Sequence, residues 1–315
     1  MLRQLAIGIL LGVGVLPSPA DAWWDEGHMQ VAAVAYDKLT VPVRAEVDRL
    51  IRLNPEYPSW IAGYPANKAA QYAFVRAAIW ADDIKKAELG YTDKNDKPDN
   101  PEAARNIGYY DHLMHKYWHF KDIGFSTDGT PVDDPDPVNI GTQIEVLASG
   151  LNRSRDCLTM SVHMILFGCF TLSAMRISHC TQRPAFHRTA RMAIKAATCR
   201  RSFLRPGETI TLHAYWDRQL GGSSTLEGAV LDALVFPETK LPDADAARAM
   251  VADPDVWLHE SRELAVDNAY AEPVKSGTEP YVLDRQYETN ARRIARQQAA
   301  LAGARLANLI NNALQ

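Results

Sequence analysis

Apolar residues recur at helical spacing along most of this chain, and this pattern limits the folds open to it. A stripe of apolar side chains every three or four residues lets a helix bury one face, whereas a half-buried strand needs strict alternation, which is rare here. The helical repeat is visible in Val31–Leu39, Val47–Ile51, Ala70–Ile79 and Ile294–Ile310, and the region beyond residue 205 is interpreted as helical. We therefore expect an all-α, single-domain, multi-helix fold.

The first 22 residues have the pattern of an export signal. Arg3 supplies positive charge, Leu5–Leu16 is an apolar run, and Ala20-Asp21-Ala22 offers the small-x-small cleavage pattern. The run is shorter than the ~20 apolar residues that a membrane span needs. The sequence thus predicts a signal peptide at residues 1–22 and a helical domain at 23–315, periplasmic or secreted, with no membrane association.

The charge balance restricts how this protein could bind a phosphate. A formal net charge of -4 disfavours nonspecific nucleic-acid binding through a broad basic surface. Divalent ions concentrate positive charge that a Lys/Arg field would spread. A phosphate substrate would therefore be held mainly by metal ions, and no protein partner is indicated.

Cleavage after Ala22 would place Trp23 at the mature amino terminus, five positions before His28. A free α-amine has a pKa near ~8 and can give up its proton to a metal near neutral pH. With the Trp23 carbonyl it forms a five-membered chelate, and His28 can close on the same ion.

Further candidate ligands lie along the chain. His213 and Asp217 stand at i and i+4, which puts an imidazole and a carboxylate on one helix face. Asp82 follows Trp80-Ala81, and His119 lies in the string Tyr117-Trp118-His119-Phe120-Lys121-Asp122. Each alone is more typical of a packed or capping residue, but their joint order is far more specific.

In that order, these motifs resemble the zinc-dependent single-strand nucleases of the fungal and mung-bean type. The resemblance runs from Trp23 to the segment 302–307, apart from a central span. It implies a mostly helical enzyme with three zinc ions in a cleft. Such an enzyme cuts single-stranded DNA or RNA to 5′-phosphates and in many cases removes 3′-phosphates from nucleotides.

The resemblance also implies a role for each matched residue. The zinc ligands would be Trp23 and His28 for one ion, Asp82 and His119 for a second, and His213 and Asp217 for a third. The substrate side would involve Phe120, which matches an aromatic that stacks on a base, Asp122, which matches a carboxylate that hydrogen-bonds it, and Lys85, which matches a basic residue near the scissile phosphate. Stacking works for any base with an exposed face, so single strands would be preferred.

Between residues 152 and 205 the composition changes abruptly. This span holds all four cysteines, four of the eight methionines and many arginines, and its only acid is Asp156. The family's His-x3-Asp-x5-His motif, in a Gly-Asp-x-His-x-Pro-Leu-His context, and its Gly-Asp-x-Gly-Gly-Asn turn should lie in this part of the chain, but neither is present. His163, His179 and His187 occur here at spacings that do not match.

A shifted reading frame explains the missing motifs. Read two bases later, the codons of Met164-Ile165 must give Asp, and those of Cys180-Thr181 must give His or Tyr. Permitted codons over residues 170–182 then yield the missing His-rich motif, and those from Met192 onward yield the Gly-rich turn. The segment 152–204 is therefore interpreted as aberrant, and the printed chain is expected to be inactive or misfolded.

Two alternative functions remain open from the sequence. A zinc phospholipase C shares the helical architecture, the amino-terminal Trp and a similar zinc cluster, although Phe120 followed by Asp122 favours a nucleobase. A non-catalytic metal-binding protein is compatible with the incomplete ligand set. A helical exported domain with purely structural His and Asp residues is the plainest reading, and the joint order of motifs disfavours it.

Overall fold

We describe the protein from a computed structural model of the whole chain. The structure describes residues 25–85, 89–105, 112–123, 131, 134–153, 201–205, 208–221, 225–276 and 281–315. The helices before the central span are α1 (Asp25–Lys38), α2 (Val41–Ile51), α3 (Tyr57–Trp60), α4 (Ala66–Asp83), the 3-10 turn η3 (Lys116–His119) and α5 (Ile140–Arg153). Those after it are α7 (Leu212–Asp217), α8 (Leu226–Leu234), α9 (Ala246–Ala249), α10 (Pro254–Leu264), the π-helical turn η4 (Ala265–Ala269) and α11 (Arg285–Leu314).

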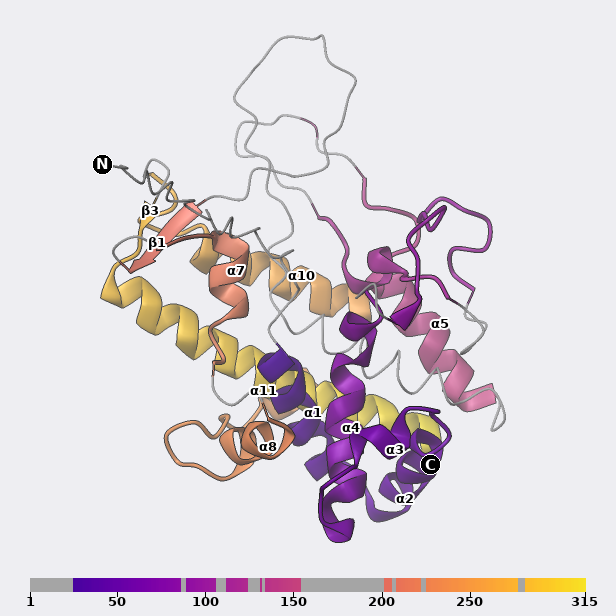
Figure 1. Cartoon of the computed structure of the whole chain (residues 1–315). Helices are drawn as coiled ribbons and strands as arrows, with labels where there is room; N and C mark the ends of the chain where they lie inside the picture. Colours follow the sequence, from indigo (N-terminus) through magenta and orange to yellow (C-terminus); the bar gives the residue numbers. More distant parts are fainter. Residues whose placement is uncertain are drawn as a thin grey trace, which may run out of the picture.

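Helix α11 is the scaffold of the fold, running through the molecule beside α1 and α2 (Figure 1). Its amino end is capped by Asp284, whose Oδ1 accepts a hydrogen bond from the Tyr287 backbone N–H at 2.7 Å. Where α11 crosses α1, Gly303 faces Val34, and a Cβ at position 303 would lie 2.6 Å from the Val34 side chain. The close approach of these two helices therefore requires glycine at this position.

The described part of the protein contains two large apolar cores. The larger core is formed by α1, α2, α4, α5, α8 and the carboxyl-terminal half of α11, and it includes the fully buried Trp80 and Trp118. The second core joins α7 and η4 to the amino-terminal half of α11, around Trp216 and Tyr287. The predominance of helices confirms the all-α prediction.

A small sheet is the one departure from the helical expectation among the described residues. Its strands β1 (Arg201–Arg205), β2 (Glu208–Thr211) and β3 (Tyr281–Val282) have the order β2-β1-β3, with β1 antiparallel to β2 and parallel to β3. The helical interpretation beyond residue 205 is thus wrong for β2, whose Thr-Ile-Thr run is rich in β-branched residues that favour strands.

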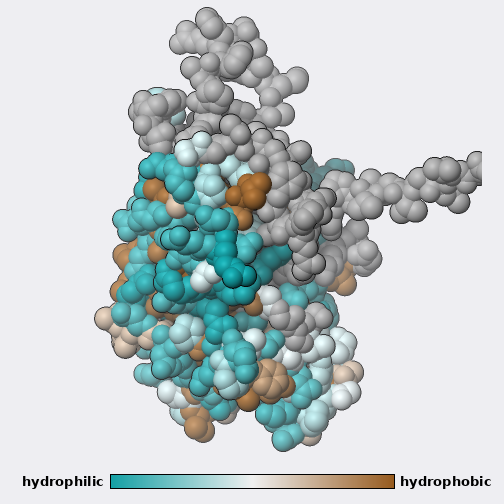
Figure 2. Space-filling model, turned by 90° about the vertical axis from the view of Figure 1, so that its left-hand side faces the viewer, coloured by the Kyte–Doolittle hydropathy of each residue, from teal (hydrophilic) through white to brown (hydrophobic). Residues whose placement is uncertain are grey.

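Within the described ranges, no helix is both long and apolar enough to cross a bilayer. The face shown in Figure 2 is mostly hydrophilic, with apolar residues in small separate groups. The expected signal peptide, Trp23 and the cysteines of the central span lie outside the described residues.

Candidate active site

Four predicted site residues from three separate elements meet around one buried carboxylate. Asp82, near the end of α4, lies with its Oδ2 3.3 Å from His28 Nε2 of α1. Its Oδ1 lies 3.7 Å from His119 Nδ1 of η3 and 2.5 Å from Lys85 Nζ. We call His28, Asp82, Lys85 and His119 the Asp82 cluster. His28 and His119 are 0% and 1% exposed, so both imidazoles are removed from bulk solvent.

The position of Asp82 conflicts with the local preference of a helix. Asp82 and Asp83 occupy the last turn of α4, where the partial negative charge of the helix end disfavours anions. Burial would further raise the pKa of Asp82, but the Lys85 charge and hydrogen bonds from His119 and His28 outweigh it and hold this pKa well below its ordinary value. Asp82 is therefore an anion that its neighbours stabilise, and such local conflicts are typical of functional sites.

A polar network behind α4 fixes the direction in which Asp82 points. Glu56 accepts hydrogen bonds from the indole N–H of Trp80 at 3.0 Å and from that of Trp60 at 3.3 Å. Arg76 pairs with Asp83 and lies over the Trp60 ring. Because Trp80 and Asp83 flank Asp82, these contacts hold the end of the helix on both sides of the carboxylate.

The turn η3, which carries His119, is held by the loop that precedes it. His115 has a left-handed backbone with φ of 42°, and its N–H donates to Asp96 Oδ2 at 2.6 Å. The His115 ring stacks on Trp118, and the Trp118 indole N–H donates to the Ala103 carbonyl at 2.8 Å. The segment 91–105 is a mostly exposed loop, but the side chains of Asp96 and Ala103 are buried and hold η3.

The two expected base-binding residues follow His119 directly. Phe120 is half-buried and packs against the larger core, with extended backbone angles, whereas Asp122 is exposed. Asp122 lies near Asp136, because its charge contributes, after burial, to raising the pKa of Asp136. The predicted base-binding ring thus follows His119 of the Asp82 cluster directly, and the predicted base-binding carboxylate comes three residues after His119.

A second His–Asp pair is carried by the short helix α7. His213 Nε2 lies 3.2 Å from Asp217 Oδ2, as the i, i+4 spacing predicts, and Asp217 is 2% exposed. Thr211 caps the helix by accepting a hydrogen bond from the Ala214 N–H at 3.0 Å. The turn after α7 is tied to α1, since Gln30 Nε2 donates to the Gly221 carbonyl at 3.1 Å.

The donor types fit zinc, but the arrangement is incomplete. Imidazole nitrogens and carboxylate oxygens are ordinary zinc ligands. In the ranges that the structure describes, however, no group of three or more His, Cys, Asp or Glu side chains is arranged to hold an ion. Trp23, expected to complete a set with His28, lies outside those ranges.

Comparison with known protein families identifies the family of this chain. Its sequence matches the S1/P1 nuclease family over residues 23–167 and 199–315. The chain belongs to the S1/P1 nuclease family. Membership in the S1/P1 nucleases makes it a hydrolase of phosphodiester bonds with a nucleic-acid substrate. The same sequence matches none of the curated proteins with which it was compared.

The match to the S1/P1 nucleases is interrupted where the sequence analysis expects an aberrant segment. The unmatched residues 168–198 all lie within 152–204 and contain His179, His187 and two of the four cysteines, Cys169 and Cys180. The matched parts include every residue that we assigned to the site, from Trp23 to Asp217. Most of 152–204 lies outside the described residues.

Sequence reasoning did not identify several residues that support this site. Asp96, His115 and Glu56 were not among the predicted site residues. A sequence signal was available for Arg76. Two adjacent acidic residues at the end of an apolar helix need nearby cations, and Arg76 provides one of them beside Lys85. Asp96 and Glu56 carried no comparable signal, since their partners are distant in sequence.

Proposed function

We propose that this S1/P1 nuclease is an exported zinc-dependent enzyme that cuts single-stranded DNA or RNA to 5′-phosphate products and also acts as a 3′-nucleotidase. The observation that carries the proposal is the convergence of His28 and His119 on Asp82, with Phe120 following His119 directly. The residues that we assign to metal and phosphate binding are thus directly followed by the aromatic residue that we assign to base binding. A nuclease needs both at this spacing, whereas a lipid headgroup offers no base to stack.

Trp23 and His28 would hold one zinc ion, Asp82 and His119 a second, and His213 with Asp217 a third. When bound, zinc acidifies water and offsets the charge of the phosphate oxygens. Lys85 contributes positive charge at the same carboxylate, and we assign it to the scissile phosphate. Asp82 stays ionised at neutral pH because its pKa is lowered, so it is ready to bind a cation without first losing a proton.

Phe120 and Asp122 supply the preference for single strands. A base stacked on one aromatic ring gains roughly 1–3 kcal/mol, and a base inside a duplex cannot reach the ring without unstacking. Asp122 is exposed and can accept hydrogen bonds from an exocyclic amino group. These two side chains therefore select for unpaired nucleotides, while the Asp82 cluster acts on the phosphate.

The printed chain lacks the central motif that should complete this centre, and we propose that the gene of the functional enzyme reads residues 152–204 in a shifted frame. The family match stops inside that segment and resumes at residue 199, which supports the proposal. The product of the corrected gene is called the frame-restored chain below. The printed chain, with its incomplete ligand set, is expected to be at most a weak metal-binding protein.

Removing the Phe120 ring tests the base-binding part of the proposal. In the frame-restored chain, Phe120→Ala should raise KM for a single-stranded oligonucleotide by about 5- to 150-fold, the equivalent of one lost stacking contact. Hydrolysis of an abasic phosphodiester should change little. Phe74→Leu, a core substitution away from η3, is the control for general destabilisation. An unchanged KM for the oligonucleotide would remove Phe120 from the substrate site.

A further inference from the structure

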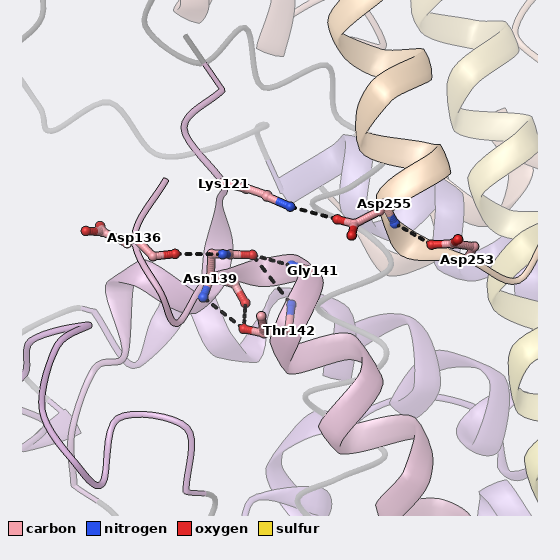
Figure 3. Close-up of polar contacts among 7 residues, drawn as sticks. All are labelled: Lys121, Asp136, Asn139, Gly141, Thr142, Asp253 and Asp255. Atoms are coloured by element: carbon pink, nitrogen blue, oxygen red, sulfur yellow. Dashed lines mark hydrogen bonds and ion pairs between the residues drawn. The ribbon is translucent and has the colours of Figure 1, made fainter. Parts of the chain in front are cut away.

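The segment that carries Phe120 and Asp122 is held from behind by a polar junction between two helix starts (Figure 3). Lys121 Nζ contacts Asp255 Oδ1 of α10 at 2.7 Å. The carbonyl of Phe120 accepts a hydrogen bond from the Ile140 N–H at the start of α5, at 3.1 Å. The segment therefore has one attachment through its backbone and one through the side chain between the two expected base-binding residues.

The alternation of an extended chain explains why Lys121 lies behind the site. Phe120 has extended backbone angles, and successive side chains along an extended segment point to opposite sides. Phe120 and Asp122 are then directed to one side and Lys121 to the other. An attachment of Lys121 to α10 consequently sets the direction of both neighbours without occupying the space that a base would enter.

The two helix starts are themselves well fixed. Asn139 Oδ1 accepts a hydrogen bond from the Gly141 N–H at 3.0 Å, and Thr142 Oγ1 accepts one from the Asn139 N–H at 3.0 Å. Asn139 Nδ2 donates to the Asp136 carbonyl at 2.8 Å. A Cβ at Gly141 would lie 3.1 Å from Leu258 Cδ1 and 3.6 Å from Asp255 Oδ1, so α5 and α10 are in close contact at this point.

Asp255 is also restrained on its own helix. Its backbone N–H donates to Asp253 Oδ1 at 2.8 Å, which caps the start of α10. The Lys121 side chain is 21% exposed and that of Asp255 is 61% exposed, so water screens much of their electrostatic attraction. An isolated exposed ion pair would contribute little to stability, and its importance here is directional, since it joins a substrate-binding segment to a capped helix.

We propose that Lys121 is a positioning residue for base recognition, which holds Phe120 and Asp122 toward the substrate by pairing with Asp255. This inference rests on the proposed function and extends it, because it makes recognition of the base, but not of the sugar phosphate, depend on the Lys121–Asp255 contact. Nucleotides with a base would be affected by its loss, whereas a ribose phosphate without a base would not.

The test compares binding of 5′-AMP and ribose 5-phosphate to the full-length frame-restored chain in the presence of zinc. Lys121→Met keeps the aliphatic length but removes the charge, and it should weaken binding of 5′-AMP by about three- to tenfold while leaving ribose 5-phosphate unchanged. Asp255→Asn should have the same effect from the other side. The exchanged pair Lys121→Asp with Asp255→Lys should recover most of the lost affinity for 5′-AMP. A merely structural role for the pair would weaken binding of ribose 5-phosphate as well, and the unchanged affinity for that ligand excludes it.

Two control variants separate the inference from the proposed function. Arg49→Met breaks an exposed ion pair with Glu46 on α2 and should change neither affinity. Phe120→Ala should abolish the preference for 5′-AMP. If Phe120→Ala does so and Lys121→Met does not, the role of Lys121 is overturned and the base site stands. If the unaltered chain binds 5′-AMP no more tightly than ribose 5-phosphate, the base site itself is overturned, and the role of Lys121 with it.

Discussion

The Asp82 cluster and the His213–Asp217 pair use the same residue types but are built in different ways. The Asp82 cluster draws on α1, α4 and η3, and α1 and α4 are long helices of the larger core. The pair belongs to one helix of six residues that follows the small sheet and packs on the second core. In the cluster, one carboxylate serves two imidazoles and an ammonium group, whereas Asp217 is placed by its own helix.

This difference shows which part of the site depends on long-range folding. The i, i+4 spacing alone brings His213 to Asp217, so the pair requires only a local helix. The Asp82 cluster requires that α1, α4 and η3 pack correctly, and it is surrounded by supports such as Glu56 and Asp96. The Asp82 cluster is therefore sensitive to the packing of helices that are far apart in the sequence, whereas the contact within the His213–Asp217 pair depends on its own helix.

The largest expected effect comes from the central segment. Restoring the reading frame between the codons of Asn152 and Leu204 should raise hydrolysis of single-stranded DNA by more than about a hundredfold over the printed chain, because even residues that only support a metal ligand are worth about 10- to 100-fold. Bound zinc per chain should rise in parallel. Equal activity of the two chains would show that the central motif is dispensable.

Removing one carboxylate at a time measures how the two regions differ. In the frame-restored chain, Asp82→Asn should lower zinc affinity more than Asp217→Asn does, since Asp82 serves two imidazoles and Asp217 one. We expect a loss of about a hundredfold or more for Asp82→Asn, measured by zinc titration. Asp48→Asn, which alters the hydrogen bond with Tyr36 on a part of α1 and α2 outside the cluster, is the matched control. Equal losses of zinc affinity for Asp82→Asn and Asp217→Asn would show that the Asp82 cluster and the α7 pair do not differ in this respect.

A packing change should affect the Asp82 cluster and spare the α7 pair. Gly303→Ala forces a Cβ against Val34 and should destabilise the protein by about 1–3 kcal/mol in urea unfolding, because the contact between α11 and α1 is overpacked. Adding Val34→Ala should recover only a small part of this loss, because it removes Val34 Cγ1 but leaves Val34 Cβ and the Val31 carbonyl oxygen in place. A stability unaffected by Gly303→Ala would mean that α1 and α11 separate at low cost.

The smallest expected effect is a change in acid sensitivity. Because the pKa of Asp82 is lowered in the folded protein, its ionisation stabilises the fold above the ordinary aspartate pKa of 3.8, and this contribution is lost as the pH falls toward the folded value. Asp82→Asn should therefore flatten the fall in unfolding free energy on acidification, as measured by urea unfolding at several pH values.

Asp48 provides a control of opposite sign for this measurement. Burial raises the pKa of Asp48 despite the hydrogen bond from Tyr36 and the nearby arginines, so its contribution to stability is present at low pH and declines as the pH rises through its folded pKa. Asp48→Asn should steepen the acid limb of the stability curve. If both variants changed the slope in the same direction, the assignment of the acid limb to Asp82 would be wrong.

Local patterns in the sequence were sufficient for much of the fold. The apolar stripes of α1, α4 and α11 predict helices, since periodicity requires only the geometry of the helix itself. The short strand β2 was missed because four residues carry too little periodic signal to distinguish strand from helix. The roles of all the predicted site residues, from Trp23 to Asp217, remain predictions.

The sequence by itself determined that the chain is helical, that His213 and Asp217 share a helix face, and that its motifs follow the order of a nuclease family. Only the tertiary structure decided that Asp82 lies between His28 and His119, and that Lys121 is joined to Asp255 behind the base-binding segment. The physical reason is the range of the interactions. Helix formation and i, i+4 contacts are local, whereas a buried carboxylate receives its partners only when helices far apart in the chain pack together.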